Sequence, residues 1–361
     1  MPAGEAEDMR VDEVWQRITE AGIRVLRIPT PFAVGRVNCY LLEDEPLTLI
    51  DAGPNSGKAL DELERQLGAL GHTIEQIGLV ILTHQHIDHL GLVQIVARRS
   101  GAEVAAIDAV VPFVQSFGED AERDDQQAAE LMLAHGIPED VVTALRSVSR
   151  SFRAWGAKVQ VTRPLADGER LRFADRELEV QLRPGHSPSD TLFWDERRRI
   201  LIAADHLIKH ISSNPLISRP LDGSNRRRRA LVEYLESLKR TRELPAEVVL
   251  AGHGEPITDH VSLIDQRFTL HQRRAEKLHG LIAEQPRTGY ELAQALWGNV
   301  AVTQAFLTLS EVVGHVDLLV NAGRVRETRD GGLVRFEATA QTEASALGDL
   351  IPGGNPALEK G

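Results

Sequence analysis

An apolar strand that leads directly into a cluster of metal-binding side chains constrains this 361-residue chain more than any other feature. Residues 78–83, Gly-Leu-Val-Ile-Leu-Thr, have the length and composition of a buried strand. His84-Gln-His-Ile-Asp-His89 follows at once, so four potential metal ligands lie within six residues. A turn at the strand end brings such side chains together, whereas a continued strand would point them to opposite faces. The alternative is a solvated loop that happens to be rich in histidine.

The composition sets limits on the architecture and on the ligands of a metal. With 361 residues, 42% of them hydrophobic, the chain is long for one domain, so we expect one large and one small unit. The single cysteine, Cys39, excludes an intramolecular disulfide and a thiolate-rich zinc site. A bound metal would therefore be held by histidines and carboxylates. The 41 basic and 53 acidic residues give a net charge of −12, which disfavours a nucleic-acid partner without excluding one.

The two ends of the chain show no sign of targeting or of a packed structure. The N-terminus has neither a basic start nor an apolar run, and no uncharged stretch approaches the length of a membrane span. We therefore expect a cytoplasmic protein with no membrane partner. Residues 1–20 are predicted to be flexible. The small, polar residues 338–361 carry no pattern and are predicted to be a disordered tail.

Short β-branched runs alternate with amphipathic ones through the first 260 residues, which predicts an α/β domain over 21–260. The predicted strands are 23–28, 36–42, 46–51, 77–83, 103–107, 158–162, 168–173 and 176–183. The predicted helices in this part are 57–70 and 90–99. A segment at about 108–157 is charged and helical by composition, and we interpret it as an inserted helical cap.

The residues after 260 change to long helical patterns followed by a hairpin that turns at Asp330-Gly-Gly. The predicted helices are 260–284, 288–297 and 302–321. Three helices and a hairpin predict a winged-helix-like domain over 261–337. The third helix has no Lys or Arg from Val302 to Val320, so it is not expected to read a nucleic-acid groove. Its apolar side chains are expected to be buried or to face a second subunit, which makes a homodimer one expected assembly. These residues are Leu307, Leu309, Val312, Val313, Val316 and Leu319.

The His-x-His-x-Asp-His cluster at 84–89 resembles the signature of the metallo-β-lactamase superfamily of hydrolases. Other segments resemble motifs of that family in the same order along the chain. They are Asp51-Ala-Gly, Arg183-Pro-Gly-His186-Ser, Ala203-Ala-Asp205 and Ala251-Gly-His253-Gly. The C-terminal part resembles the winged-helix appendage of the branch that contains the lactamase-like endoribonuclease and related bacterial hydrolases. The resemblance implies a four-layer αβ/βα sandwich with a helical insertion and this appendage.

The resemblance also implies a site with two zinc ions and a catalytic role for Asp88. The implied ligands are His84, His86 and His186 for one ion, Asp88, His89 and His253 for the other, and Asp205 as a bridge. Imidazole and carboxylate groups suit zinc, and manganese or iron would tolerate the same set. A hydroxide that bridges the ions would attack the substrate, and Asp88 would orient it. His206, Lys209 and His210 follow closely and are candidates for contacting substrate, the alternative being structural support or exposed charge.

The acidic charge balance and the helical cap favour hydrolysis of a small ester, thioester or lactone. A metal-dependent endoribonuclease or phosphodiesterase is the alternative, since the appendage resembles that of an endoribonuclease. A non-catalytic DNA-binding ligand sensor is a third hypothesis, against which the complete ligand set argues. The one basic run, Arg226–Arg229, is expected to pair with nearby glutamates on a solvated face rather than to grip phosphate.

Overall fold

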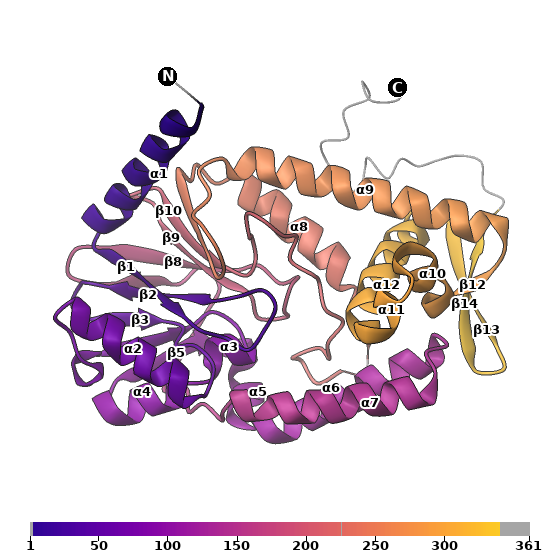
Figure 1. Ribbon diagram of the computed structural model, residues 1–361, viewed down its shortest axis with the longest axis horizontal. Coiled ribbons are helices and arrows are strands. Elements are labelled where there is room, and N and C mark those ends of the chain that lie inside the picture. Colours follow the sequence, from indigo (N-terminus) through magenta and orange to yellow (C-terminus); the bar gives the residue numbers. More distant parts are fainter. Residues whose placement is uncertain (1–2, 225, 340–361) are drawn as a thin grey trace.

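Two β-sheets packed face to face form the centre of the protein. The computed structural model describes residues 3–224 and 226–339 (Figure 1). The first sheet has the strand order β1-β2-β3-β4-β5-β6, and the second has the order β11-β10-β9-β8-β7. Helices cover the outer face of each sheet, so the layers follow the order αβ/βα (Figure 1). The predicted α/β four-layer fold is confirmed.

The first sheet combines an antiparallel half with a parallel half: β1 to β3 are antiparallel, and β3 to β6 are parallel. Its strands are β1 (Ile23–Ile28), β2 (Val37–Leu42), β3 (Thr48–Ile50), β4 (Leu79–Leu82), β5 (Glu103–Ile107) and β6 (Arg163–Leu165). The strand predicted at 158–162 is wrong, because β6 begins only at Arg163. Val159 and Val161 alternate with exposed residues and are buried, as in a strand. Between them, however, the backbone N–H of Gln160 donates to the Gln94 side chain and not to a neighbouring strand.

The second sheet is apolar on both faces, because one face packs on the first sheet and the other on helices. Its strands are β7 (Arg170–Arg172), β8 (Glu177–Leu182), β9 (Thr191–Asp195), β10 (Ile200–Ala204) and β11 (Val248–Ala251). Along β10, Ile200 and Ile202 join the core between the sheets, while Leu201 and Ala203 join the core beneath the helices. The period-two alternation of a strand therefore fills two separate cores. Packing on both faces holds the ends of such strands in place. Side chains that follow these ends are therefore well positioned for a functional site.

Helices α2 (Gly57–Ala69) and α4 (Val93–Ser100) cover the first sheet, and a 3-10 turn lies at Ile74–Gln76. The N-terminus differs from the prediction of a flexible segment, because helix α1 spans Ala3–Glu20. Ile18 is 1% exposed, and Val14 and Trp15 pack on the core between the sheets, so one apolar face of α1 is anchored. The tail predicted to be disordered lies, from residue 340 on, outside the described residues.

The segment predicted to be helical at about 108–157 forms two long helices, which run beside each other along one edge of the molecule (Figure 1). The helices of this insertion are α5 (Val111–Gln115), α6 (Phe117–Ala134) and α7 (Glu139–Phe152), with 3-10 turns at Asp108–Val110 and Arg153–Trp155. At the far end of α6, the His135 ring stacks on Phe336 with the ring centroids 5.5 Å apart. The insertion thus joins the first sheet to the C-terminal part of the chain.

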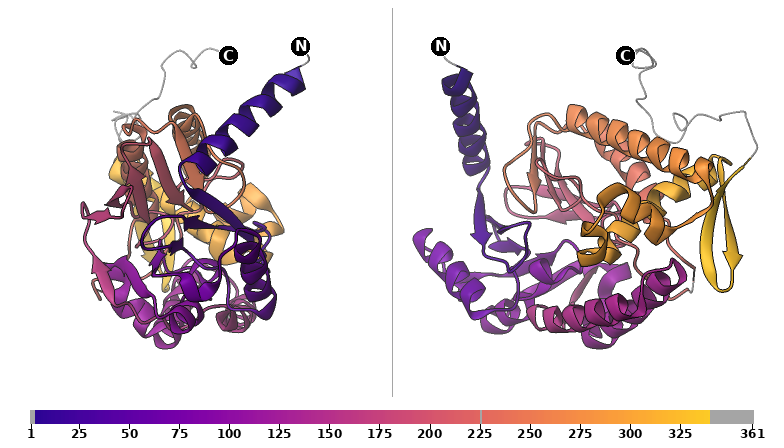
Figure 2. Two further views of the ribbon diagram at one scale, coloured as in Figure 1. Left: turned by 90° about the vertical axis from the view of Figure 1, so that its left-hand side faces the viewer. Right: turned by 45° about the vertical axis from the view of Figure 1, so that its right-hand side comes forward.

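The C-terminal part lies at one end of the molecule, between the α6–α7 pair and the helices over the second sheet (Figure 2). Its elements and those over the second sheet are α8 (Ala230–Arg242), α9 (His260–Glu284), β12 (Arg287–Thr288), α10 (Gly289–Trp297), α11 (Val300–Thr303), α12 (Ala305–Asn321), β13 (Val325–Asp330) and β14 (Leu333–Ala338). The three predicted long helices and the hairpin at Asp330-Gly-Gly are confirmed. In the described parts of the chain, no helix is both long and apolar enough to cross a membrane.

Five of the six apolar residues named on α12 are buried, which is one of the two alternatives that the sequence left open. Leu309, Val312, Val313, Val316 and Leu319 are at most 1% exposed, because they pack within the chain in the core beneath α8, α9 and α10. The remaining one, Leu307, is 40% exposed. Most of the apolar face of α12 is therefore internal packing.

Candidate metal centre

The predicted ligands all lie in loops at one edge of the two sheets. His84 follows β4, and the cluster continues into the one-turn helix α3 (Ile87–Leu90), which carries Asp88 and His89. The other three come from the second sheet: His186 lies between β8 and β9, Asp205 directly follows β10, and His253 follows β11. Strands of both sheets end on this side of the sandwich, so the side chains that follow them converge here.

The seven side chains come together in overlapping groups, within each of which the ligand atoms lie less than 4.8 Å apart. The groups are His84 with His86 and His186, Asp88 with His89 and His253, and His84 with His89 and Asp205. The first two groups are the two ligand sets that the resemblance implies. The third connects them through Asp205.

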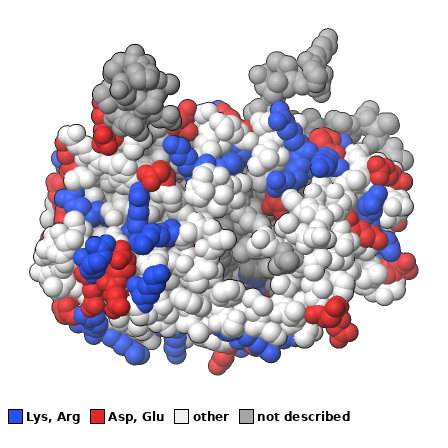
Figure 3. Space-filling view, viewed as in Figure 1, with Lys and Arg blue, Asp and Glu red and all other residues white. Residues whose placement is uncertain are grey.

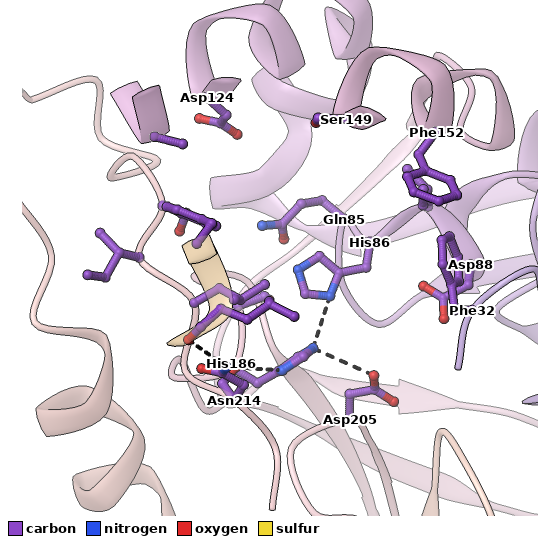
Figure 4. Close-up of a pocket in the computed structure, with 18 of the residues that line it drawn as sticks. Phe32, Gln85, His86, Asp88, Asp124, Ser149, Phe152, His186, Asp205 and Asn214 are labelled. Carbon is purple, nitrogen blue, oxygen red and sulfur yellow. Dashed lines mark hydrogen bonds and ion pairs between the residues drawn. The ribbon is translucent and has the colours of Figure 1, made fainter. Parts of the chain in front are cut away.

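Asp205 lies between the two sets, as a bridging ligand must. Its Oδ1 is 3.5 Å from His89 Nε2, and its Oδ2 is 3.6 Å from His186 Nε2 and 3.5 Å from His253 Nε2. Figure 4 shows this carboxylate opposite His186, with His86 beyond. Gly252 is required beside it, since a Cβ atom there would lie 2.1 Å from Asp205 Oδ1. Ala204 has a left-handed φ of 43°, a strained conformation that turns the chain directly before the aspartate.

Four of the five histidines are oriented by a partner at Nδ1, which leaves Nε2 pointing to the centre. The partners are Thr83 Oγ1 for His84 (3.0 Å), Asp51 Oδ2 for His89 (2.7 Å), Asn214 O for His186 (3.1 Å) and Arg36 O for His253 (2.9 Å). His86 differs, because its Nδ1 lies 2.9 Å from His186 Nε2 and therefore faces the centre itself. Such partners fix ring orientation and tautomer in metal sites.

The residues fit a pair of divalent cations. His84 Nε2, His89 Nε2 and Asp205 Oδ1 are buried and have no hydrogen-bond partner within the protein. Leaving a buried polar atom unpaired costs about 1–3 kcal/mol, so three of them side by side indicate a missing partner. Imidazole nitrogen and carboxylate oxygen are the donor atoms that zinc prefers. A cation at each group would satisfy all three atoms.

The electrostatics of the two groups also favour positive charge between them. Burial lowers the pKa of His84 well below its usual value and that of His86 to about 3, so both rings are neutral and offer a lone pair. Burial opposes a charged His253 as well, yet Asp205 raises its pKa to about 10. The carboxylates thus create a field strong enough to hold a proton on a buried ring, and a metal cation would meet the same field.

A further cluster of histidines, between α9 and α12, has a different character. His271 Nδ1 lies 3.0 Å from His315 Nε2, and His315 Nδ1 lies 2.6 Å from the Glu311 carbonyl oxygen. The Glu311 carboxylate pairs with Arg274. The facing nitrogens of the two rings and the Glu311 carboxylate are engaged in these contacts, whereas His271 Nε2 is buried without a hydrogen-bond partner in the described structure.

A cavity of about 710 Å³ opens from the metal centre. His86, Asp88 and Asp205 lie on its wall, with Gln85 beside them (Figure 4). Most of the remaining wall comes from α6, α7, the segment 208–218 and the start of α12, with Phe32 and Val34 from the loop before β2 and Phe113 from α5. The size falls within the range of roughly 300–1,000 Å³ of small-molecule sites.

None of His206, Lys209 and His210, the candidates for contacting substrate, lies on the wall of this cavity, which fits the alternative of structural support or exposed charge. A turn closes from Ala203 to His206, so the chain reverses at Asp205 and sends the next side chain into the core. The His206 ring is fully buried, with its Nε2 2.9 Å from Thr241 Oγ1. Lys209 and His210 are exposed outside the cavity.

Two residues that support the ligands were not assigned this role from the sequence, although Asp51 belongs to the Asp51-Ala-Gly motif. Asp51 lies at the end of β3 and accepts hydrogen bonds from Thr83 while it orients His89. A carboxylate directly after an apolar strand was the signal for it. Asn214 supports His186 through its backbone oxygen, and no side-chain pattern marks such a role.

All seven predicted metal ligands lie within the part of the chain that matches a known family. Residues 33–253 match the model of the metallo-beta-lactamase superfamily, so the chain belongs to that superfamily, and its site is that of a metal-dependent hydrolase. A "probable metallo-hydrolase", YqjP of Bacillus subtilis (strain 168), is 33% identical over 323 residues, which cover 89% of this chain and 99% of that protein.

Two solved structures resemble the chain beyond the matched domain. A metallo-beta-lactamase family protein from Thermus thermophilus is 28% identical with a TM-score of 0.73, and the similarity covers 88% of this chain and 99% of that one. A beta-lactamase domain protein from Burkholderia ambifaria is 26% identical with a TM-score of 0.76, and the similarity covers 88% and 92% of the two chains. Since these shares exceed the length of the matched domain, the likeness includes much of the C-terminal part.

Proposed function

We propose that this protein uses two zinc ions to hydrolyse an ester, thioester or lactone of a small molecule. The observation that carries the proposal is the junction of the seven-residue ligand cluster with a largely apolar cavity. Manganese or iron would suit the same ligands. When bound, two such ions supply a shared water of lowered pKa as the nucleophile and polarise the carbonyl oxygen.

Asp88 is the residue to which we assign the orienting role. Its Oδ2 lies 3.4 Å from His253 Nε2, at the mouth of the cavity. Burial would raise its pKa, but the neighbouring His89 and His253 hold that pKa below its usual value. Asp88 is therefore ionised at neutral pH and can accept a hydrogen bond from an attacking water, which fixes the direction of attack.

The charges around the cavity favour an acyl substrate over RNA. Outside the metal centre, the charged side chains on the described wall each face an opposite charge. These pairs are Asp124 with Arg219, Asp125 with Arg153, and both Arg146 and Arg153 with Glu122. On the face that Figure 3 shows, basic and acidic residues alternate around a largely uncharged middle. A ribonuclease needs a continuous basic groove, which these surfaces do not supply.

The basic run Arg226–Arg229 does not provide that groove either. Arg227 makes a two-pronged pair with Asp317 of α12, at 2.6 and 2.7 Å. Arg228 is 6% exposed and pairs with Glu233, and Arg229 bonds to Asn321. The expected pairing with acidic neighbours is found, but Arg228 is buried rather than solvated. Three of the four arginines hold the chain together instead of presenting charge.

The test combines metal analysis with a substrate panel. We expect about two metal ions per chain by elemental analysis after loading with zinc, and turnover of simple esters, thioesters or lactones. Asp205→Ala should lose both the turnover and part of the metal, while Asp61→Asn on the exposed face of α2 should lose neither. A zinc-loaded protein that cleaves RNA or a phosphodiester but no acyl compound would overturn the proposal. Full metal content with no hydrolysis of any of these would instead support a ligand sensor.

A further inference from the structure

The cavity beyond the metal centre is long, and one face of α6 follows it. The α6 residues on its wall are Phe117, Ala121, Asp124, Asp125, Ala128 and Met132, a helical spacing. The first and the last of these residues are fifteen positions apart, which corresponds to about 22 Å along the helix axis. Phe117 is the end near the metals, because both its ring and the side chain of Ile87, next to His86, crowd around Gly156. Met132 is the far end, where it joins the core that contains α12.

Apolar side chains from four other parts of the chain complete this elongated space. Phe32 comes from the loop before β2, Leu145 and Phe152 from α7, Ile217 from the segment after Asp205, and Phe306 from α12. At the opening, four large apolar side chains remain partly exposed. They are Val148, Phe152, Ile211 and Leu307, which are 37–48% exposed. Exposed apolar residues that gather at one cavity indicate a site for an apolar ligand.

Among the uncharged side chains of this wall, the buried polar atoms without a partner lie toward the metal centre. Ser212 Oγ and Asn214 Oδ1 have no hydrogen-bond partner in the described structure. The backbone oxygen of Asn214 contacts His186, and its amide nitrogen donates to the Leu307 carbonyl oxygen at 3.2 Å, so this pair lies between the metal centre and the start of α12. The cavity is therefore polar near the metal centre. Along α6 it is apolar apart from Asp124 and Asp125, which pair with Arg219 and Arg153. A ligand that matches it has a polar group at one end of an extended apolar chain.

We propose that the cavity binds an extended, uncharged acyl chain, and that the ester, thioester or lactone group of the same molecule lies at the metal centre. This inference rests on the proposed function and specifies its substrate class. The chain lies between the α6–α7 pair and α12, with Ser212 and Asn214 beside its polar group. An elongated shape and the absence of unpaired charge among the described wall residues distinguish this ligand from a compact or phosphorylated one.

The first test uses a series of 4-nitrophenyl esters from acetyl to decanoyl with the zinc-loaded protein. We expect kcat/KM to rise with chain length by up to about fourfold per methylene, since each buried methylene stabilises the complex. Ala128→Phe should remove most of this rise, because a ring at that position fills the cavity. Ala144→Phe is the matched control, since Ala144 is exposed on α7 and not part of the wall. A flat series, or equal behaviour of the two variants, would overturn the inference.

The second test measures binding without turnover, so that it stands apart from catalysis. The neutral fluorophore N-phenyl-1-naphthylamine should bind the zinc-loaded protein and be displaced by 1-decanol but not by 1-butanol. Leu307→Asp should weaken this binding by at least about tenfold, because it puts a charge on the wall. Leu133→Asp is the control, since Leu133 is 42% exposed on α6 but lies outside the cavity.

The two tests separate failure of the inference from failure of the proposed function. Hydrolysis of short esters without chain-length dependence, together with no displacement by 1-decanol, would overturn the acyl site and leave the hydrolase intact. Displacement by 1-decanol that Leu307→Asp weakens, with no hydrolysis of any ester, would support the acyl site and refute the proposed function.

Discussion

The two ends of the cavity are built from different structural elements and different kinds of side chain. At the metal end, short loops at strand ends carry the ligands, and buried partners such as Asp51 fix their rings. At the other end, helices α6, α7 and α12 supply apolar side chains, some of them partly exposed. In the proposed function, reactivity and selectivity are therefore located in separate parts of this chain. The first belongs to the two sheets, and the second to an insertion and a C-terminal addition.

The largest effect is expected at the metal end. His186→Ala and Asp205→Ala should each lower kcat/KM by more than about 100-fold, since loss of even a supporting partner in a metal site costs 10- to 100-fold. Metal content by elemental analysis should fall in parallel, while the far-UV circular dichroism stays unchanged. Activity within a few-fold of the parent in either variant would remove that residue from the site.

Asp51→Asn tests the support of the metal end and should have the next largest effect. The amide cannot supply the charge that orients His89, so zinc affinity should fall by about 10- to 100-fold. Competition with a chelator measures this affinity. Chain-length preference should not change, because Asp51 does not line the cavity. A change of preference with unchanged zinc affinity would contradict the division between the two ends.

Arg227→Gln tests how much the ion pair between this arginine and α12 stabilises the fold at the apolar end. This arginine pairs with Asp317, whose side chain is 5% exposed, so its loss leaves a buried carboxylate without its partner. We expect the free energy of unfolding to fall by about 3 kcal/mol in urea denaturation. After loading with zinc, the variant should contain as much metal as the parent protein. Arg226→Gln, at an exposed neighbouring position, should change neither quantity.

Phe152→Ala tests the part of the apolar wall that lies nearest the metal centre. Phe152 lies four residues before Gly156, where Ile87 and Phe117 pack, and its ring lies 5.6 Å from that of Phe32, centroid to centroid. Loss of such a ring contact should raise KM for an ester by roughly two- to tenfold. The KM values for an acetyl ester and for a long-chain ester should rise alike, because even a short chain reaches a ring at the metal end. A change for the long-chain ester alone would place Phe152 at the far end of the cavity.

Salt should have the smallest effect of all. The wall charges are paired, so kcat/KM for an ester should change by less than about twofold from low to physiological salt. Substituting all four residues of Arg226–Arg229 with glutamine should keep this salt independence in the protein that remains folded. Strongly salt-sensitive cleavage of single-stranded RNA, lost in the same variant, would favour the ribonuclease alternative.

The sequence by itself determined the fold class and, through the resemblance of its motifs, the candidate ligand set. Each predicted ligand lies directly after an apolar strand or in a short motif, so its position depends on a few neighbouring residues. Local signals also placed the long C-terminal helices and the hairpin. They failed where packing decides. Helix α1 packs on the core through three apolar side chains, and its sequence, taken alone, resembles that of a polar, flexible segment. Val159 and Val161 alternate as in a strand, but they do not belong to one.

The tertiary structure alone decided the cavity and what surrounds the metal centre. Its wall joins Phe32 to Phe306, and the apolar face of α6 reads in sequence like that of any helix that packs on a core. The same holds for His206, which a turn directs away from the cavity, and for Asn214, which acts through its backbone. The physical reason is that the apolar run and the turn residues that mark a strand end lie next to each other in the sequence. Whether an apolar face is filled or left open depends on side chains that approach from distant parts of the chain.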